Sequence, residues 1–75
     1  MKQYREAEKA YREVIKEREE VLGERHFKTL LTKSSLMATL FEMERFGEVR
    51  AIGKEILRIY EEEPEEYAKY LESDT

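Results

Sequence analysis

Apolar residues recur every three or four positions along most of this 75-residue chain. That spacing places them on one side of an α-helix, which turns once every 3.6 residues or so. It predicts helices at about residues 2–22, 27–43, 46–62 and 65–72. The alternation of period two that marks a β-strand does not appear. The expected fold class is therefore all-α.

The middle segment differs from its neighbours in how much of its circumference is apolar. Leucine, methionine, phenylalanine and alanine cover more than half of it between residues 27 and 43. The segments on either side carry a narrower apolar stripe and a charged outer face. A helix that is apolar over so wide an arc is packed on two sides. We therefore expect the middle helix to lie between the other two.

Short breaks separate the segments. Gly23 follows the apolar pair at 21–22, where a helix C-cap needs a residue that tolerates positive φ. Residues 44–47 form the second break, and Pro64, which cannot continue a helix, forms the third. These breaks predict antiparallel helical hairpins within a single domain that spans residues 1–75.

Charged residues make up 43% of the sequence, but the two signs are interleaved and the formal net charge is only -4. A slightly acidic chain is a poor general binder of nucleic acid, so no nucleic-acid partner is expected. No apolar run approaches the roughly 20 residues that a bilayer requires, so no membrane association is expected. Cysteine is absent, which suits a reducing compartment and predicts a cytoplasmic location.

The residues with catalytic potential form no known catalytic or metal-binding arrangement. His26 is the only histidine, and a catalytic imidazole needs an orienting partner and a nucleophile, while zinc needs three or four ligands. Ser34 and Ser35 lack the Gly-x-Ser-x-Gly elbow of a serine hydrolase. Gly47 and Gly53 lack the Gly-Lys element of a phosphate loop. We expect no enzyme activity, no cofactor and no metal, and a structural or solvent-facing role for His26.

Two charged runs leave alternatives open. The run EEEPEE at 61–66 indicates a solvated helix end, with a basic partner as the alternative. Arg50, Lys54 and Arg58 recur every four residues, so they form either a solvated face or a surface for an anion or an acidic peptide. The aromatic residues on helical stripes are expected in the core: Tyr4, Tyr11, Phe41, Phe46 and Tyr60.

The first and third segments resemble each other. A shift of about 42 residues lays YREAEKAYREVIKERE over FGEVRAIGKEILRIYE without a gap. Tyr4 then meets Phe46, and Val14 meets Ile56, so the apolar positions coincide. Both segments are therefore expected to pack through the same pattern of apolar positions.

The run YREAEKAYREVIKEREEVLGERH is similar to the second helix of a tetratricopeptide repeat of the long, kinesin-light-chain-like kind. The residues that carry the resemblance are Tyr4, Glu6, Ala7, Glu8, Tyr11, Leu22, Gly23 and His26. Residues 29–46 resemble the first helix that follows in this family. Phe27 stands where the family has proline, Glu44 where it has a helix-ending glycine, Met37 where it has a small residue, and Gly53 where it has an aromatic one.

The resemblance implies about one and a half antiparallel hairpins plus a short C-terminal helix. Helical repeats do not close their own apolar faces, so it also implies a non-catalytic protein–protein interaction module or scaffold. The concave face of the family, carried onto this chain, comprises Leu31, Ser34, Ala38, Phe41 and Glu42. An amphipathic helix or an extended apolar peptide, of unknown identity, suits such a groove.

A second hypothesis is structural. In it the chain is a self-associating helical bundle, and the open face of residues 4–22 is buried against another copy in a homo-oligomer. Light scattering at several protein concentrations distinguishes this hypothesis from a monomer that awaits a different partner.

Overall fold

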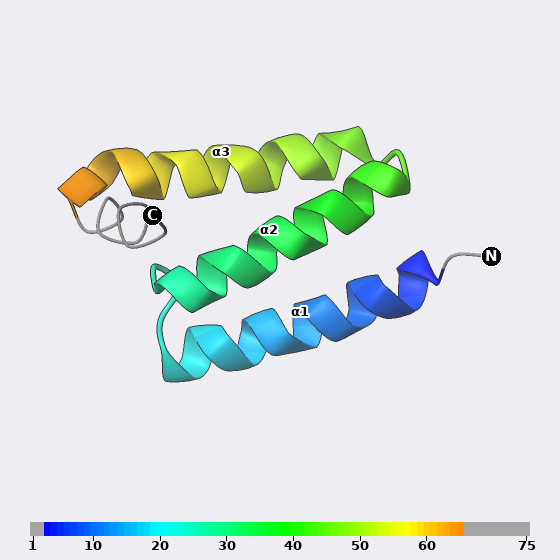
Figure 1. The fold of residues 1–75 in the computed structure, drawn as a ribbon, viewed down its shortest axis with the longest axis horizontal. Coiled ribbons are helices and arrows are strands. Elements are labelled where there is room, and N and C mark those ends of the chain that lie inside the picture. The colour runs from blue at the N-terminus through cyan, green and yellow to red at the C-terminus, as the bar shows by residue number, and fades with distance from the viewer. Residues whose placement is uncertain (1–2, 66–75) are drawn as a thin grey trace, which may run out of the picture.

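The computed structural model describes residues 3–65, which form three α-helices (Figure 1). They are α1 (Tyr4–Val21), α2 (Phe27–Glu42) and α3 (Phe46–Glu62). α1 and α3 run in the same direction and flank α2, which runs in the opposite direction. The described residues contain no strand, so the all-α fold class of antiparallel hairpins is confirmed. The expected helix at 65–72 lies outside the described residues.

The core lies along the two seams of α2, because α2 packs against both of its neighbours as its wide apolar arc predicts. Two clusters of buried aliphatic side chains fill these seams. The first joins α2 to α1 and comprises Ile15, Leu36 and Leu40. The second joins α2 to α3 and comprises Leu30, Ile56 and Ile59.

The turn between α1 and α2 ends one helix and caps the next. Gly23 has a φ of 97°, and its N–H donates to the carbonyl of Glu19 at 3.1 Å. His26 is the N-cap of α2, since its Nδ1 accepts a hydrogen bond from the N–H of Lys28 at 3.0 Å. The Thr29 hydroxyl donates to the Gly23 carbonyl at 2.9 Å. His26 therefore has the structural role that its isolation in the sequence indicates.

The turn between α2 and α3 also ends a helix, but the residue in the left-handed conformation is Glu44 instead of a glycine. The N–H of Arg45 donates to the carbonyl of Leu40 at 3.0 Å, and that of Glu44 donates to Phe41 at 2.9 Å. This is the Schellman arrangement, in which the residue after the C-cap is left-handed. Glu44 adopts that conformation with a φ of 61°, at a cost of about 1 kcal/mol relative to glycine.

Two aromatic side chains that we expected in the core lie on the surface instead. Phe41 is 57% exposed and Phe46 is 49% exposed. α2 directs Leu40 into the seam, so Phe41, the next residue, points away from it. The rings of Phe41 and Phe46 pack edge to face, with centroids 5.3 Å apart. The remaining aromatic residues of that set are partly buried: Tyr4, Tyr11 and Tyr60.

Candidate functional site

The five residues assigned to the concave face share one side of α2. Leu31, Ala38, Phe41 and Glu42 are exposed, and Ser34 is partly buried. Because they are spaced at three, four and seven residues, they lie along a single face of the helix. This side of α2 is the one that neither α1 nor α3 covers.

Four of these five residues line a shallow hollow of about 430 Å³ at the edge between α2 and α3. Its lining consists of Ser34, Met37, Ala38, Phe41 and Glu42 from α2 and Val49 from α3. Leu31 is not part of the lining, and it lies about one helical turn before Ser34. The hollow is therefore mainly apolar, with one hydroxyl and one carboxylate.

The departures at Met37 and Gly53 from the repeat pattern compensate each other beside this hollow. A Cβ placed on Gly53 would lie 3.5 Å from the sulfur of Met37, which is an ordinary van der Waals contact. A large side chain on α2 thus occupies the room that an aromatic residue on α3 would take. The flexible methionine fills it without strain.

A buried lysine that the sequence pattern does not reveal links all three helices. Lys33 of α2 is 7% exposed, and its Nζ lies 3.0 Å from Glu19 of α1 and 3.1 Å from Glu55 of α3. Burial alone would lower the pKa of Lys33. The hydrogen bonds that Lys33 donates to the two carboxylates outweigh this effect, so the pKa of Lys33 lies above its ordinary value.

A closed ring of four ion pairs joins α1 to α3 near the second turn. Arg12 lies 2.9 Å from Glu8 and 3.1 Å from Glu48. Arg45 lies 2.7 Å from Glu8 and 2.5 Å from Glu48. The hydrogen bond from Arg12, helped by Arg45 and opposed by partial burial, holds the pKa of Glu8 below its ordinary value. Glu8 therefore stays ionised at neutral pH.

The acidic run that begins at the end of α3 has a basic partner within the chain. Arg25, in the first turn, pairs with Glu62 and lies 2.7 Å from Glu63. Its hydrogen bond lowers the pKa of Glu62. The first turn is therefore tied to the end of α3 by charge.

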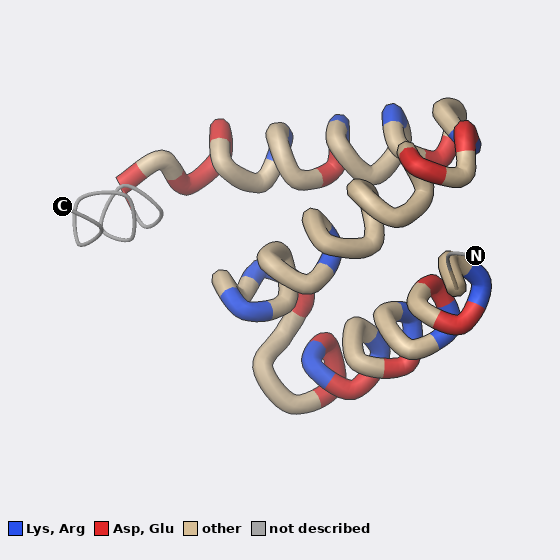
Figure 2. Tube along the Cα trace, turned by 45° about the vertical axis from the view of Figure 1, so that its right-hand side comes forward, with Lys and Arg blue, Asp and Glu red and all other residues tan. Residues whose placement is uncertain are grey.

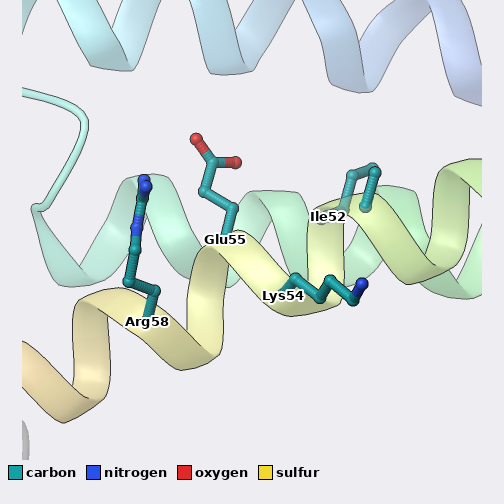
Figure 3. A pocket seen from close by; sticks show the side chains of 5 residues that line it. Ile52, Lys54, Glu55 and Arg58 are labelled. Atoms are coloured by element: carbon teal, nitrogen blue, oxygen red, sulfur yellow. The ribbon is translucent and has the colours of Figure 1, made fainter.

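The basic stripe of α3 does not converge on a site for a small anion. A hollow of about 410 Å³ is lined by Ala51, Ile52, Lys54, Glu55 and Arg58. Arg58 points toward α1 while Lys54 lies along α3, and the carboxylate of Glu55 stands between them (Figure 3). Two cations that diverge around a carboxylate cannot enclose an anion together.

Within residues 3–65, no group of three or more histidine, cysteine or acidic residues is placed to hold a metal ion. None of the three helices is long and apolar enough to cross a membrane. The Nδ1 of His26 is engaged in the helix cap rather than with a nucleophile.

Comparison with known families supports the resemblance carried by the first helix. A family model described as tetratricopeptide repeat matches residues 1–28, which include α1 and the turn with Gly23 and His26. No curated protein and no solved structure matches the chain. The kinesin-light-chain-like subdivision stays a prediction. Over these residues the chain is similar to a tetratricopeptide repeat, a kind of repeat that typically acts as a non-catalytic scaffold for protein–protein interaction.

Proposed function

We propose that this chain is an interaction module that binds an apolar peptide segment on the outer face of α2 and the adjoining edge of α3. The observation that carries the proposal is the pair of large apolar side chains left half exposed there, Phe41 and Phe46, whose rings pack against each other. Clustered exposed apolar side chains mark interaction surfaces far more often than scattered ones do. The repeat match at residues 1–28 supports the same class of function.

The paired rings of Phe41 and Phe46 are the natural anchor for a partner. They hold each other edge to face, so a bound segment meets a surface that is already ordered. Covering a half-exposed ring contributes about 1 kcal/mol. A short peptide on this hollow is therefore expected to bind in the micromolar range or more weakly.

The polar groups of the hollow favour a particular kind of segment. Ser34 and Glu42 line it together with apolar side chains, and Glu42 is exposed. An amphipathic helix or an extended peptide with an apolar side chain over Phe41 and a basic residue near Glu42 satisfies both. The role is non-catalytic, and a cytoplasmic location is part of the proposal.

A displayed peptide library, with amphipathic helical and extended apolar members, tests this function. The selected peptides are measured against the wild type and against Ala38→Glu, which puts a charge into the hollow. Ala51→Glu is the matched control, because it makes the same change at an exposed alanine on α3 outside the hollow. Binding should fall at least about tenfold in Ala38→Glu and stay unchanged in Ala51→Glu.

Phe41→Ala gives an independent check with the same peptides, since it removes the anchor without adding charge. Its affinity should fall by about fivefold to tenfold. The proposal is wrong if the library yields no binder, or if the selected peptides bind Ala38→Glu and Phe41→Ala as tightly as the wild type.

A further inference from the structure

α1 leaves an acidic row uncovered on the side away from α2. Its members are all exposed and lie at steps of seven, four and three: Glu6, Glu13, Glu17 and Glu20. An apolar edge, formed by Ala10 and Val21, runs beside this row, and Val21 is 75% exposed. α1 therefore presents to water a row of negative charge with an apolar border.

α3 presents the opposite pattern. Arg50, Lys54 and Arg58 are exposed, and basic positions recur along the outer edge of this helix, away from α2 (Figure 2). The side chain of Arg58 turns from this edge toward α1 of the same chain (Figure 3). Phe46 and Leu57 form an exposed apolar edge beside them. α3 therefore presents a row of positive charge with an apolar border.

Neither row is neutralised by a salt bridge within the described residues. The carboxylates of α1 that form ion pairs are others, Glu8 and Glu19. None of the three cations of the α3 row takes part in those bridges. Arg58 does attract the carboxylate of Glu62, four residues further on. Both rows thus remain available to opposite charge from outside the molecule.

The two rows also match in length and order. Arg50 to Arg58 extends about 12 Å, and the part of the acidic row from Glu13 to Glu20 extends about 10 Å, with Glu6 lying about 10 Å further along α1. Because α1 and α3 run in the same direction, a parallel stack that joins the apolar borders also lays the acidic row on the basic row. In this orientation Lys9 and Lys16, on the other flank of α1, turn away from the apolar contact.

We propose that a second copy of this chain docks head to tail, with the acidic row of α1 in one copy on the basic row of α3 in the next. Both halves of the contact are present in one molecule, and their charges are complementary. The contact joins two different surfaces, so it can extend beyond a dimer. It shares Phe46 with the peptide site proposed above but leaves Ala38 and Glu42 uncovered, and it is tested by charge changes outside that site.

Charge exchange between the two helices tests this assembly. One variant carries Glu13→Lys and Glu17→Lys on α1, and the other carries Arg50→Glu and Lys54→Glu on α3. Sedimentation is measured from about 5 µM to about 500 µM, because association depends on protein concentration. The wild type should exceed its monomer mass of 9.1 kDa as concentration rises, and each variant alone should stay monomeric. An equimolar mixture of the two variants should associate again.

Three further measurements complete this test. Circular dichroism verifies that each variant keeps its helices, and the milder pair Glu17→Gln and Lys54→Gln should weaken association about threefold each without reversing any charge. Raising salt from about 0.05 M to about 0.5 M should weaken the wild-type assembly at least several-fold. A wild type that stays monomeric, variants that associate like the wild type, or folded variants that fail to associate when mixed would each overturn the proposal. Association with an unchanged salt response would overturn it as well.

Discussion

The two sides of α2 have similar composition but different surroundings. Toward α1 and α3, α2 buries Leu30, Leu36 and Leu40. On the other side, Leu31 and Phe41 are more than half exposed although they are just as apolar. An apolar arc therefore predicts a covered helix but does not tell which part of the arc the same chain covers. A partner that covers the exposed part would bury apolar surface and so gain binding free energy.

Polar side chains occur on the buried side of α2 as well as on its exposed side. Thr29 is fully buried and Lys33 nearly so, and both have hydrogen-bond partners. Among the described residues, no buried side-chain nitrogen or oxygen lacks a partner. A polar side chain is tolerated in the seam when it is paired, so polarity alone does not separate the two sides.

The largest effect is expected from Leu40→Ala in the seam. Leu40 is 0% exposed and belongs to the cluster that joins α2 to α1. Truncating such a residue leaves a cavity and should lower the free energy of unfolding by about 2–5 kcal/mol. Urea unfolding followed by circular dichroism measures this loss. A change under about 1 kcal/mol would show that the seam is not the core of the fold.

Lys33→Met is expected to have the next largest effect, about 1–2 kcal/mol at neutral pH, since it leaves two carboxylates without their cation. Glu19 and Glu55 are each about one-third exposed, so water limits the loss. The folded pKa of Lys33 is raised above 10.5, so its contribution is complete below that pH and disappears as the pH rises through the folded pKa. The stability difference between wild type and variant should therefore shrink in alkaline solution.

Urea unfolding of both proteins between neutral and alkaline pH measures that difference directly. Lys9→Met is the matched control, because Lys9 is an exposed lysine on α1 that takes part in no salt bridge among residues 3–65. The control should change stability by less than about 0.5 kcal/mol at every pH. If Lys33→Met is as stable as the wild type at neutral pH, Lys33 does not hold the three helices together.

A smaller effect is expected from Thr29→Val, about 1 kcal/mol. The Thr29 hydroxyl donates to the Gly23 carbonyl at 2.9 Å, and valine keeps the shape but loses that donor. Thr32→Val is the control on α2, since the Thr32 hydroxyl bonds only to the carbonyl of Lys28 in its own helix. Thermal unfolding compares the two variants. Equal losses would mean that the bond to the first turn has no special weight.

The features that the sequence predicts well are those that local chemistry determines. The helical periods, the glycine at 23 and the wide apolar arc of α2 each depend on neighbouring residues along the chain. The expected helical ranges are 2–22, 27–43 and 46–62. The observed helices are Tyr4–Val21, Phe27–Glu42 and Phe46–Glu62, so each end differs by two residues or fewer. The repeat match covers the segment whose motif is most complete.

What the sequence misses depends on how the helices are placed in space. The pairing of Lys33 with Glu19 and Glu55 joins residues 14 and 22 positions apart, and nothing local marks it. The ring around Arg12 and Arg45 likewise requires the distance between α1 and α3. The spacing of Phe41 fits a buried stripe and predicts a core position, but the apolar arc of α2 is wide enough to include an uncovered edge, and Phe41 lies on that edge. The assignment of the five concave-face residues stays a prediction.

The smallest effect on stability is expected from Phe41→Ala, one residue after the most sensitive position. Phe41 is largely exposed and its main contact is the edge-to-face pair with Phe46, so truncation should lower the free energy of unfolding by less than about 1 kcal/mol. Measured beside Leu40→Ala in the same urea titration, it compares adjacent residues of similar apolar character on the two sides of α2. If Phe41→Ala is as destabilising as Leu40→Ala, Phe41 belongs to the core after all, and the outer face is not a free surface for a partner. A small loss together with weaker peptide binding would assign the ring to recognition rather than to folding.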